Sequence, residues 1–178
     1  LSYWLDYDTK TATVTSLMDW PWAYGGGYTD SVIIIPSTVT YDGITYSVTG
    51  IDWFAFAWCS SLTSITIPNS ITHIGSHAFT GSGIYNKESN WDEGVLYIDN
   101  CLIIVNNDIS ATYTVKEDTR LIADCAFADC SSLTSVTIPN NVTNMGGGIF
   151  GHCKNLQSVV LPENITSLSS ALPDDVHV

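Results

Sequence analysis

Hydrophobic and polar positions recur along this chain with a period of 23 residues. Residues 56–68, 127–139 and 150–162 align without gaps as Phe-x-x-Cys-x-x-Leu-x-x-(Ile/Val)-x-(Ile/Leu)-Pro. Phe127 and Phe150 lie 23 positions apart, as do the prolines that end these two stretches. Self-similarity at a short fixed period is the mark of a solenoid, in which each repeat forms one coil.

The end of each copy alternates as a short β-strand does. Leu62, Ile65 and Ile67 are predicted to point inward, and the residues between them outward. Pro68 lacks an N–H group and ends the strand. The chain then returns through an Ile-x-x-Ile-Gly segment, where Gly75 and its equivalent Gly146 are expected to permit a turn.

An Ala-Phe-x-x-Cys segment follows, with the spacing of one helical turn. One coil thus offers about six inward apolar groups, each contributing roughly 1.5–3 kcal/mol when fully buried. This does not offset the ordering cost of about 23 residues. Coils are therefore expected to fold only when they stack on one another.

The motif Ala55-Phe56-x-x-Cys59-x-x-Leu62-x-x-Ile65-x-Ile67-Pro68 resembles the BspA-like (Treponema pallidum type) leucine-rich repeat of bacterial surface proteins. Residues 39–49 are similar to the repeat that opens the arrays of that family. The resemblance implies an α/β leucine-rich-repeat solenoid, a right-handed β-α superhelix that is rich in strand with short or irregular helical turns.

Breaks in the period suggest how a single domain over residues 1–178 is organised. Residues 1–30 are expected to form an N-terminal cap, with a hairpin turning near Asp8-Thr9-Lys10. The other parts are repeats at 31–83, an irregular acidic insert at 84–110, and repeats with a C-terminal coil at 111–178. Hairpins are predicted around Asp42-Gly43 and, inside the insert, around Asp99-Asn100.

Charge narrows the range of partners. The 178 residues contain 18 acids and 5 bases, a net charge of −13, and 45% of them are hydrophobic. So acidic a surface repels nucleic acids and anionic membranes. No run of 18 apolar residues predicts a transmembrane segment. Low charge with many small polar residues favours an extracellular or bacterial cell-surface location.

No catalytic residue, metal site or cofactor site is predicted. The repeat explains Cys59, Cys130 and Cys153 as small buried thiols, although a disulfide between adjacent coils is an alternative. Cys125 has no counterpart in other copies and is expected to be more exposed. His73 and His77 lack the glutamate and the helix of a zinc motif. The acidic run at 92–93 favours a solvated loop over a calcium site.

Aromatic residues near the N-terminus are the candidate ligand-binding residues: Trp20, Trp22, Tyr24, Tyr28, Trp53 and Trp58. Exposed aromatic rings stack on sugars or anchor protein partners, whereas in the alternative they seal the cap. A second candidate surface is the neutral ladder of outward strand residues, namely Ser64, Thr66, Ser135 and Thr137.

These features favour a non-catalytic binding module over an enzyme. The resemblance implies adhesion, that is, binding to a protein of a host, of a neighbouring cell or of the matrix. The alternatives are a glycan-binding module that uses the aromatic N-terminal loop and a structural spacer within a larger surface protein.

Overall fold

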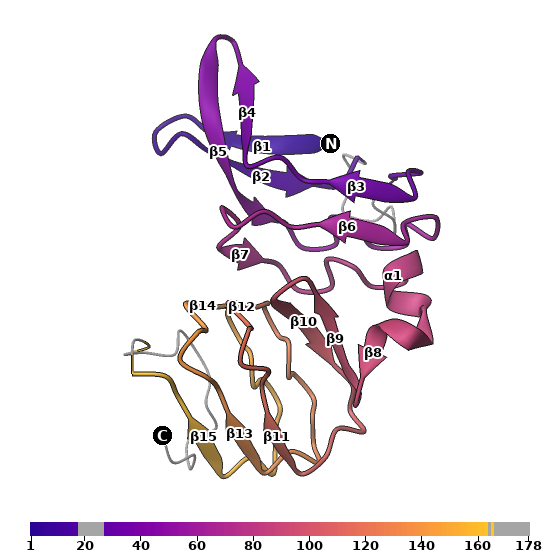
Figure 1. The fold of residues 1–178 in the computed structure, drawn as a ribbon, viewed down its shortest axis with the longest axis vertical. Helices are drawn as coiled ribbons and strands as arrows, with labels where there is room; N and C mark the ends of the chain where they lie inside the picture. The colour runs from indigo at the N-terminus through magenta and orange to yellow at the C-terminus, as the bar shows by residue number, and fades with distance from the viewer. Residues whose placement is uncertain (18–26, 164, 166–178) are drawn as a thin grey trace. The chain divides into compact units, whose positions relative to one another are not determined.

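The computed structural model describes residues 1–17, 27–163 and 165. The chain divides into two compact units, Leu1–Asn90 and Trp91–Val178, which we call the N-terminal and C-terminal units (Figure 1). Within the described residues, helix is limited to α1 (Gly83–Asn86) and the 3-10 turn η1 (Glu88–Asn90). Neither has the length or the apolar composition of a membrane-crossing helix.

Two hairpins build the main sheet of the N-terminal unit. Its strand order is β1-β2-β5-β4, with β7 paired to the far part of β5. A separate two-stranded sheet pairs β3 with β6 in parallel. The strands of this unit are β1 (Ser2–Asp6), β2 (Thr11–Thr15), β3 (Val32–Ile34), β4 (Thr38–Tyr41), β5 (Ile44–Ile51), β6 (Ser64–Thr66) and β7 (His73–Ile74).

Both predicted hairpins of the N-terminal unit are confirmed. β1 and β2 pair antiparallel across residues 7–10. β4 and β5 turn at Asp42 and Gly43, whose φ angles are 48° and 73°. A two-residue hairpin turn needs such left-handed angles because they match the twist of the flanking strands.

The C-terminal unit contains two sheets, of order β14-β12-β10-β9-β8 and β11-β13-β15. Its first two long strands form the predicted hairpin, with Asp99 at a φ of 50°. The strands of this unit are β8 (Trp91–Asp92), β9 (Val95–Ile98), β10 (Cys101–Val105), β11 (Thr112–Thr114), β12 (Leu121–Ile122), β13 (Ser135–Thr137), β14 (Asn144–Met145) and β15 (Ser158–Val160).

The 23-residue period of the sequence appears in the structure as the register of parallel strands. Ser135 pairs with Ser158, and Ile122 pairs with Met145, each 23 positions later. A third side of each coil is joined through turns: the N–H of Phe127 donates to the oxygen of Ile149 at 2.9 Å. Each coil thus donates backbone hydrogen bonds to the next along three sides.

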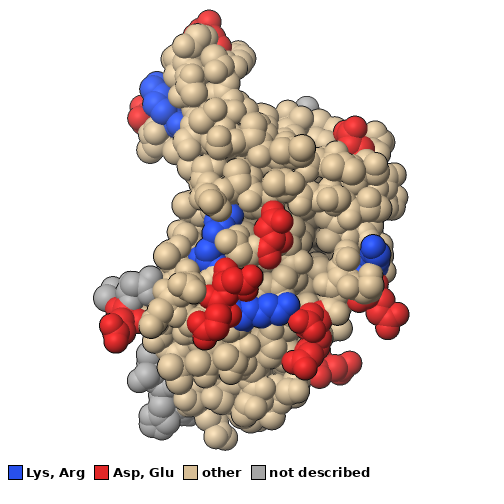
Figure 2. All heavy atoms as spheres, viewed as in Figure 1, with Lys and Arg blue, Asp and Glu red and all other residues tan. Residues whose placement is uncertain are grey.

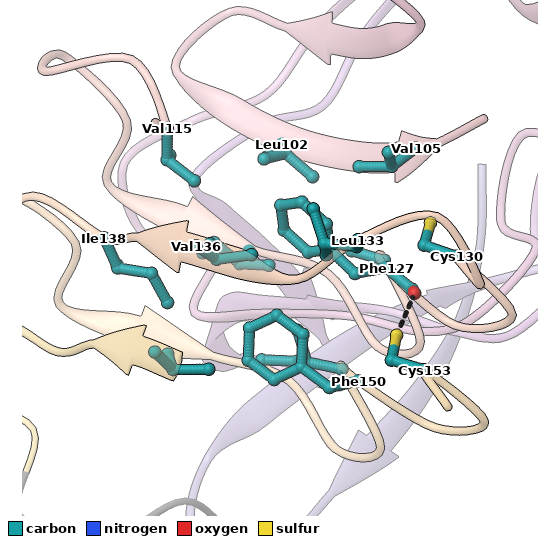
Figure 3. Close-up of a cluster of buried hydrophobic side chains, with 14 of the residues drawn as sticks. Leu102, Val105, Val115, Phe127, Cys130, Leu133, Val136, Ile138, Phe150 and Cys153 are labelled. Atoms are coloured by element: carbon teal, nitrogen blue, oxygen red, sulfur yellow. Dashed lines mark hydrogen bonds between the residues drawn. The ribbon is translucent and has the colours of Figure 1, made fainter. Parts of the chain in front are cut away.

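Equivalent side chains of successive coils stack in the core of each unit. Figure 3 shows Phe127 and Phe150 packed together in the C-terminal unit, with ring centroids 5.4 Å apart. Phe56 and Phe79 stack at the same distance in the N-terminal unit. The predicted inward residues of the first copy are buried, and the residues between them are exposed: Leu62, Ile65 and Ile67 against Ser64 and Thr66.

The Ala-Phe-x-x-Cys segments form turns rather than helices. The N–H of Cys59 does donate to the oxygen of Phe56 at 3.3 Å, as in a single tight turn. However, the N–H groups of Phe56 and Trp58 donate to the next coil, at 2.7 and 2.8 Å, so no helix can continue. The α component that the resemblance implied is therefore reduced to such turns and α1.

The expected role of Gly75 and Gly146 was wrong. Neither has a positive φ. A Cβ atom at Gly75 would lie 2.5 Å from the backbone nitrogen of Trp53, and one at Gly146 would lie 2.4 Å from that of Asp124. Glycine is needed at Gly75 and at Gly146 because the preceding coil approaches each of them too closely for a side chain.

Candidate functional site

The described residues contain no group of three His, Cys, Asp or Glu side chains able to hold a metal ion. His73 belongs to β7. His77 instead stacks on Phe54, with ring centroids 5.3 Å apart, and its Nδ1 lies 3.3 Å from the hydroxyl of Thr80. The two histidines are therefore held in separate local environments.

All five cysteines lie in the described part of the chain, and none of them forms a disulfide bond. The thiol of Cys153 donates to the oxygen of Phe127 at 3.0 Å (Figure 3). Burial raises the pKa of Cys101 to about 11 and that of Cys130 to about 12. Protonated thiols are poor nucleophiles, so these side chains serve packing. Cys125 is half-buried and is more exposed than the other four.

A polar cluster in the C-terminal unit joins the insert to the next coil. The hydroxyls of Tyr97 and Tyr113 lie 3.0 Å apart. Lys116 places its Nζ 4.5 Å from the centre of the Tyr97 ring and 2.8 Å from a carboxylate oxygen of Asp92. Burial raises the pKa of Tyr113 far above its ordinary value, so the phenol stays protonated and acts as a structural hydrogen-bonding group.

Among the described residues, every exposed aromatic side chain of Trp, Tyr or Phe belongs to the N-terminal unit: Trp4, Tyr7, Tyr41, Trp53, Phe54 and Trp58. Large exposed rings are unusual outside binding surfaces, because they leave apolar area in water. This concentration identifies the N-terminal unit as the part of the chain that carries the candidate site.

Trp53, Phe54, Trp58 and His77 form a surface that we call the aromatic ridge. The rings of Trp53 and Phe54 meet edge to face at 5.5 Å, and Phe54 stacks on His77 of the next coil. Trp53 and Trp58 are 55% and 52% exposed. Within the ridge, Trp53, Phe54 and His77 are therefore in ring contact from one coil to the next, and Trp58 lies in the same turn as Phe54.

The backbone holds the rings of the ridge outward. Phe54, Trp58 and His77 have φ angles of 53°, 60° and 58°. The N–H of Trp58 is fixed by its hydrogen bond to the next coil, and its ring lies over Gly81, where a Cβ atom would lie 2.3 Å from the indole. Only glycine leaves room for this indole, so its position is set by the coil below it.

The predicted N-terminal aromatic loop has a mixed outcome. Trp20, Trp22 and Tyr24 lie outside the described residues. Tyr28 is buried, with 6% of its surface exposed. Its hydroxyl donates to the oxygen of Thr15 at 2.6 Å and accepts from the N–H of Ser2 at 2.9 Å, and its ring packs on Phe56. Tyr28 is therefore committed to the cap and is not available to a ligand.

The predicted ladder of outward strand residues is divided between the two units. Ser64 and Thr66 are exposed on β6, whereas Ser135 and Thr137 are half-buried on β13. In the N-terminal unit, β3 adds two exposed apolar residues, Val32 and Ile34, which pair with Ser64 and Thr66. This face is more apolar than the sequence analysis predicted.

The sequence analysis missed Phe54 and His77 in the ridge and Val32 and Ile34 on β3. Phe54 precedes the core motif and was not considered as an outward residue. Val32 and Ile34 stand in an unbroken apolar run, in which alternation cannot distinguish the two faces. The repeat itself could have linked these two ridge residues, because Phe54 and His77 occupy equivalent positions 23 residues apart.

Charged residues are sparse in the sequence around the ridge, since residues 53–63 and 75–86 contain no Asp, Glu, Lys or Arg. Figure 2 shows a face on which most side chains are neither acidic nor basic. The nearest carboxylate to the ridge in sequence is Asp52, whose side chain accepts the N–H of Trp53 at 2.8 Å. The ridge therefore offers apolar area and ring faces rather than a charged pocket.

A family model described as "BspA type Leucine rich repeat region" matches residues 37–102 and 106–172, in six copies. No curated protein matches the chain. Among solved structures, a Treponema pallidum leucine-rich-repeat protein is 26% identical, with 90% of this chain and 68% of that one covered and a TM-score of 0.42.

Two further solved structures are similar. One is a leucine-rich-repeat protein from Bacteroides ovatus, 24% identical, with a TM-score of 0.41. The alignment covers 90% of this chain but only 39% of that protein. The other is a leucine-rich cell surface protein from Faecalibacterium prausnitzii, 18% identical, with 98% of this chain and 81% of that one covered and a TM-score of 0.37.

Proposed function

We propose, from the fact that the chain belongs to the BspA-type leucine-rich-repeat family, that it is a non-catalytic module that binds other proteins outside the bacterial cell or on its surface. The family match confirms the resemblance that the repeat motif indicated. The further expectation of adhesion to a host, neighbouring-cell or matrix protein is part of this proposal. So are the continuous right-handed superhelix and the single domain.

The aromatic ridge is the observation that supports this function. Tryptophan is the residue type most enriched at the energetic centres of protein interfaces. The ridge presents two half-exposed indoles, with Phe54 in ring contact with that of Trp53. Backbone hydrogen bonds hold Phe54 and Trp58 to the next coil, and the carboxylate of Asp52 accepts the N–H of Trp53. Rings fixed before binding lose little conformational entropy when a partner docks.

Glycan binding is the second candidate, and the same two indoles favour it. Trp53 and Trp58 expose ring faces of the kind that stack on sugar rings. Protein binding is preferred because the carboxylate next to the ridge in sequence, that of Asp52, is already occupied by the N–H of Trp53. A hydrogen-bonded hydroxyl usually decides sugar selectivity more than stacking does.

The test is binding of the chain to immobilised matrix proteins and mucins, with a glycan array in parallel. A Trp53→Ala, Trp58→Gly double variant should lose at least about tenfold in affinity, because it removes both indoles from the ridge. Glycine at position 58 retains the left-handed backbone. Val160→Ala is the control, since it removes an exposed apolar side chain from β15 in the C-terminal unit, away from the ridge residues in sequence.

Unchanged affinity in the double variant would show that the aromatic ridge is not the binding surface. Binding confined to the glycan array would favour the second candidate. Absence of binding to every matrix protein, mucin and glycan would favour a spacer.

A further inference from the structure

A groove lies between the two edge strands of the main sheet in the N-terminal unit. Its volume is about 740 Å³, which is within the size range of ligand-binding clefts. On one side the groove is lined by Tyr3, Trp4 and Leu5 of β1 and by Tyr7, which follows this strand. On the other side it is lined by Val39, Thr40 and Tyr41 of β4. None of these side chains is charged, and four are aromatic.

The lining shows that the groove follows the edges of the strands. Successive residues of a strand point to opposite faces of its sheet. Because Tyr3, Trp4 and Leu5 all line the groove, it must run beside β1 rather than over one face. The same reasoning applies to β4 with its three lining residues.

Both bordering strands have an unpaired edge within the described residues. β1 pairs only with β2, and β4 pairs only with β5. The two-residue turn makes Tyr41 and Ile44 a hydrogen-bonded pair, so the N–H and C=O of Thr40 point away from β5. Exposed strand edges are usually protected by charged side chains, proline or a bulge. Within the stretches that line the groove, residues 3–5 of β1 and 39–41 of β4, neither strand contains any of these.

The groove is only partly closed at its apolar positions. Trp4, Tyr7 and Tyr41 are 69%, 57% and 58% exposed, whereas alternate residues of the middle strands β2 and β5 are buried. Behind the lining, the ring of Tyr46 meets Tyr7 edge to face at 5.9 Å. Its buried hydroxyl has no hydrogen-bond partner among the described residues. Burial raises the pKa of Tyr46, and Tyr7, Asp42 and Tyr41 raise it further.

Charge next to the groove selects for a basic occupant. Asp6 and Asp42 adjoin lining residues, and the N–H groups of Asp8 and Thr9 hold the pKa of Asp6 below its ordinary value. The aromatic cluster already accommodates one cation, because the Nζ of Lys10 lies 5.9 Å from the centre of the Tyr46 ring. A lysine or arginine of a ligand would meet the carboxylates and ring faces in the same way.

We propose that this groove binds an extended peptide strand of a partner protein, which adds to the edge of β1 or β4. Apolar side chains of the peptide occupy the space between the rings, and a lysine or arginine lies at the acidic rim. This is the strand-addition mode of recognition, in which backbone hydrogen bonds supply affinity and alternate side chains supply selectivity. The inference shares with the proposed function only the premise that the partner is a protein.

The probe is a phage library of random heptapeptides, selected on the immobilised chain and followed by synthesis of the enriched peptides. We expect enriched sequences to alternate apolar residues and to contain lysine or arginine. N-methylation of the peptide backbone should weaken binding at least about tenfold at every second position and have little effect at the positions between. This period of two reports strand pairing without any change to the protein.

Variants of the protein locate the bound peptide. Tyr41→Ala and Trp4→Ala each remove an exposed ring that lines the groove, and each should weaken peptide binding at least about tenfold. The double variant of the aromatic ridge, Trp53→Ala, Trp58→Gly, should bind the peptide as the unchanged chain does. Circular dichroism checks folding, and if either groove variant unfolds, the N-methyl series alone decides.

Four results would overturn the proposal: no enriched peptide, an N-methyl series without a period of two, loss of peptide binding only in the ridge variant, or a chain dimer that Tyr41→Ala dissociates. Displacement of the peptide by a glycan would also count against it. Failure here leaves the ridge proposal intact, because that proposal is tested with different variants and immobilised matrix proteins.

Discussion

Left-handed backbone angles recur at two places in each turn of the repeat. The first place is held by Phe54, His77, Cys125 and Gly148, and the second by Trp58, Gly81, Asp129 and His152. Only two of these eight residues are glycine, although glycine adopts such angles at least cost. The turn geometry is therefore imposed by the hydrogen bonds between coils and not by local preference.

His152, with a φ of 60° and an exposed side chain, allows this strain to be measured. His152→Gly should change the free energy of unfolding by less than about 1 kcal/mol, because relief of strain offsets the greater freedom of the unfolded chain. His152→Val should destabilise by more than about 1 kcal/mol, because a β-branched residue fits a left-handed angle poorly. Urea denaturation measures both; equal effects would contradict the argument.

Gly146 and Gly147 provide a matched pair for the close approach of coils. A Cβ atom at Gly146 would collide with the backbone of Asp124, whereas at Gly147 its nearest neighbour would be a carboxylate oxygen 3.9 Å away. Gly146→Ala should cost about 1–3 kcal/mol of stability as overpacking. Gly147→Ala should cost well under 1 kcal/mol, and a similar loss in both variants would argue against contact between coils as the cause.

The buried thiols predict how stability responds to pH. The pKa values of Cys101 and Cys130, about 11 and about 12, lie above the ordinary value of 9.0. Their contribution is therefore complete below pH 9 and is lost as the pH rises, because the unfolded thiols ionise first. Between pH 8 and 10 the free energy of unfolding should fall by roughly 1 kcal/mol per thiol.

Urea titrations at several pH values measure this fall. Cys130→Ala serves as the control, because it should fall less steeply. An identical slope in the variant would mean that other groups, not this thiol, are responsible.

At the scale of elements, the sequence predicted the strands and hairpins well because their signals are local. The alternation around Ile65 and the Asp42-Gly43 turn are each readable within a few residues. The tight packing at Gly75 and the outward ring of Phe54 were not predictable, since they depend on hydrogen bonds to residues about 22 positions away. The exposure of Trp58 was predicted, because it lies between core positions of the motif. The sequence therefore predicted only those exposed aromatic residues of the candidate site that stand outside the core positions of the repeat motif.

The groove between β1 and β4 illustrates the same limit. The sequence showed two hairpins, but nothing in it placed their outer strands on either side of one cleft. That placement follows from the parallel pairing of β2 with β5, which joins segments more than 30 residues apart. Such non-local pairing leaves no short-range signal.

The stacked phenylalanines give the element-scale prediction. Phe127 is fully buried and contacts the ring of Phe150 and, at 6.0 Å between centroids, that of Tyr113. Phe127→Ala should lower the free energy of unfolding by about 3–5 kcal/mol, the cost of a large cavity. Gln157→Ala, at an exposed position of the following coil, should change it by less than about 0.5 kcal/mol. If both variants lost a similar amount of stability, the stacked phenylalanines would not be the main source of core stability in this unit.

At the scale of the whole molecule, acidic charge is unevenly shared. Eleven of the eighteen acids belong to Trp91–Val178, against three of the five bases. The ion pair between Lys116 and Asp92 is solvent-exposed and contributes little to stability. Repulsion between carboxylates therefore outweighs attraction across the surface.

Salt should consequently stabilise the protein. Raising the ionic strength from 0.01 to 0.15 M shortens the screening length from about 30 to about 8 Å and weakens this repulsion. The melting temperature, followed by circular dichroism, should rise over that range. A fall would mean that unrecognised ion pairs dominate the electrostatics.

The boundary between the two units, after Asn90, lies inside the insert that the sequence placed at residues 84–110. The break in the hydrophobic period therefore coincides with the point where the chain changes from one compact unit to the next. A single domain over the whole chain stays a prediction.

The register of the parallel strands also has a consequence for heredity. Each coil of the C-terminal unit pairs its strands with those of the next coil at the same 23-residue offset. One coil could therefore be replaced by another without changing this pairing. Residues 56–68 and 127–139, from different units, are identical at eleven of thirteen positions, and repeats this similar can recombine. The gene can thus gain or lose a coil in one event while every inward side chain still meets its equivalent, so array length can diversify faster than the core sequence.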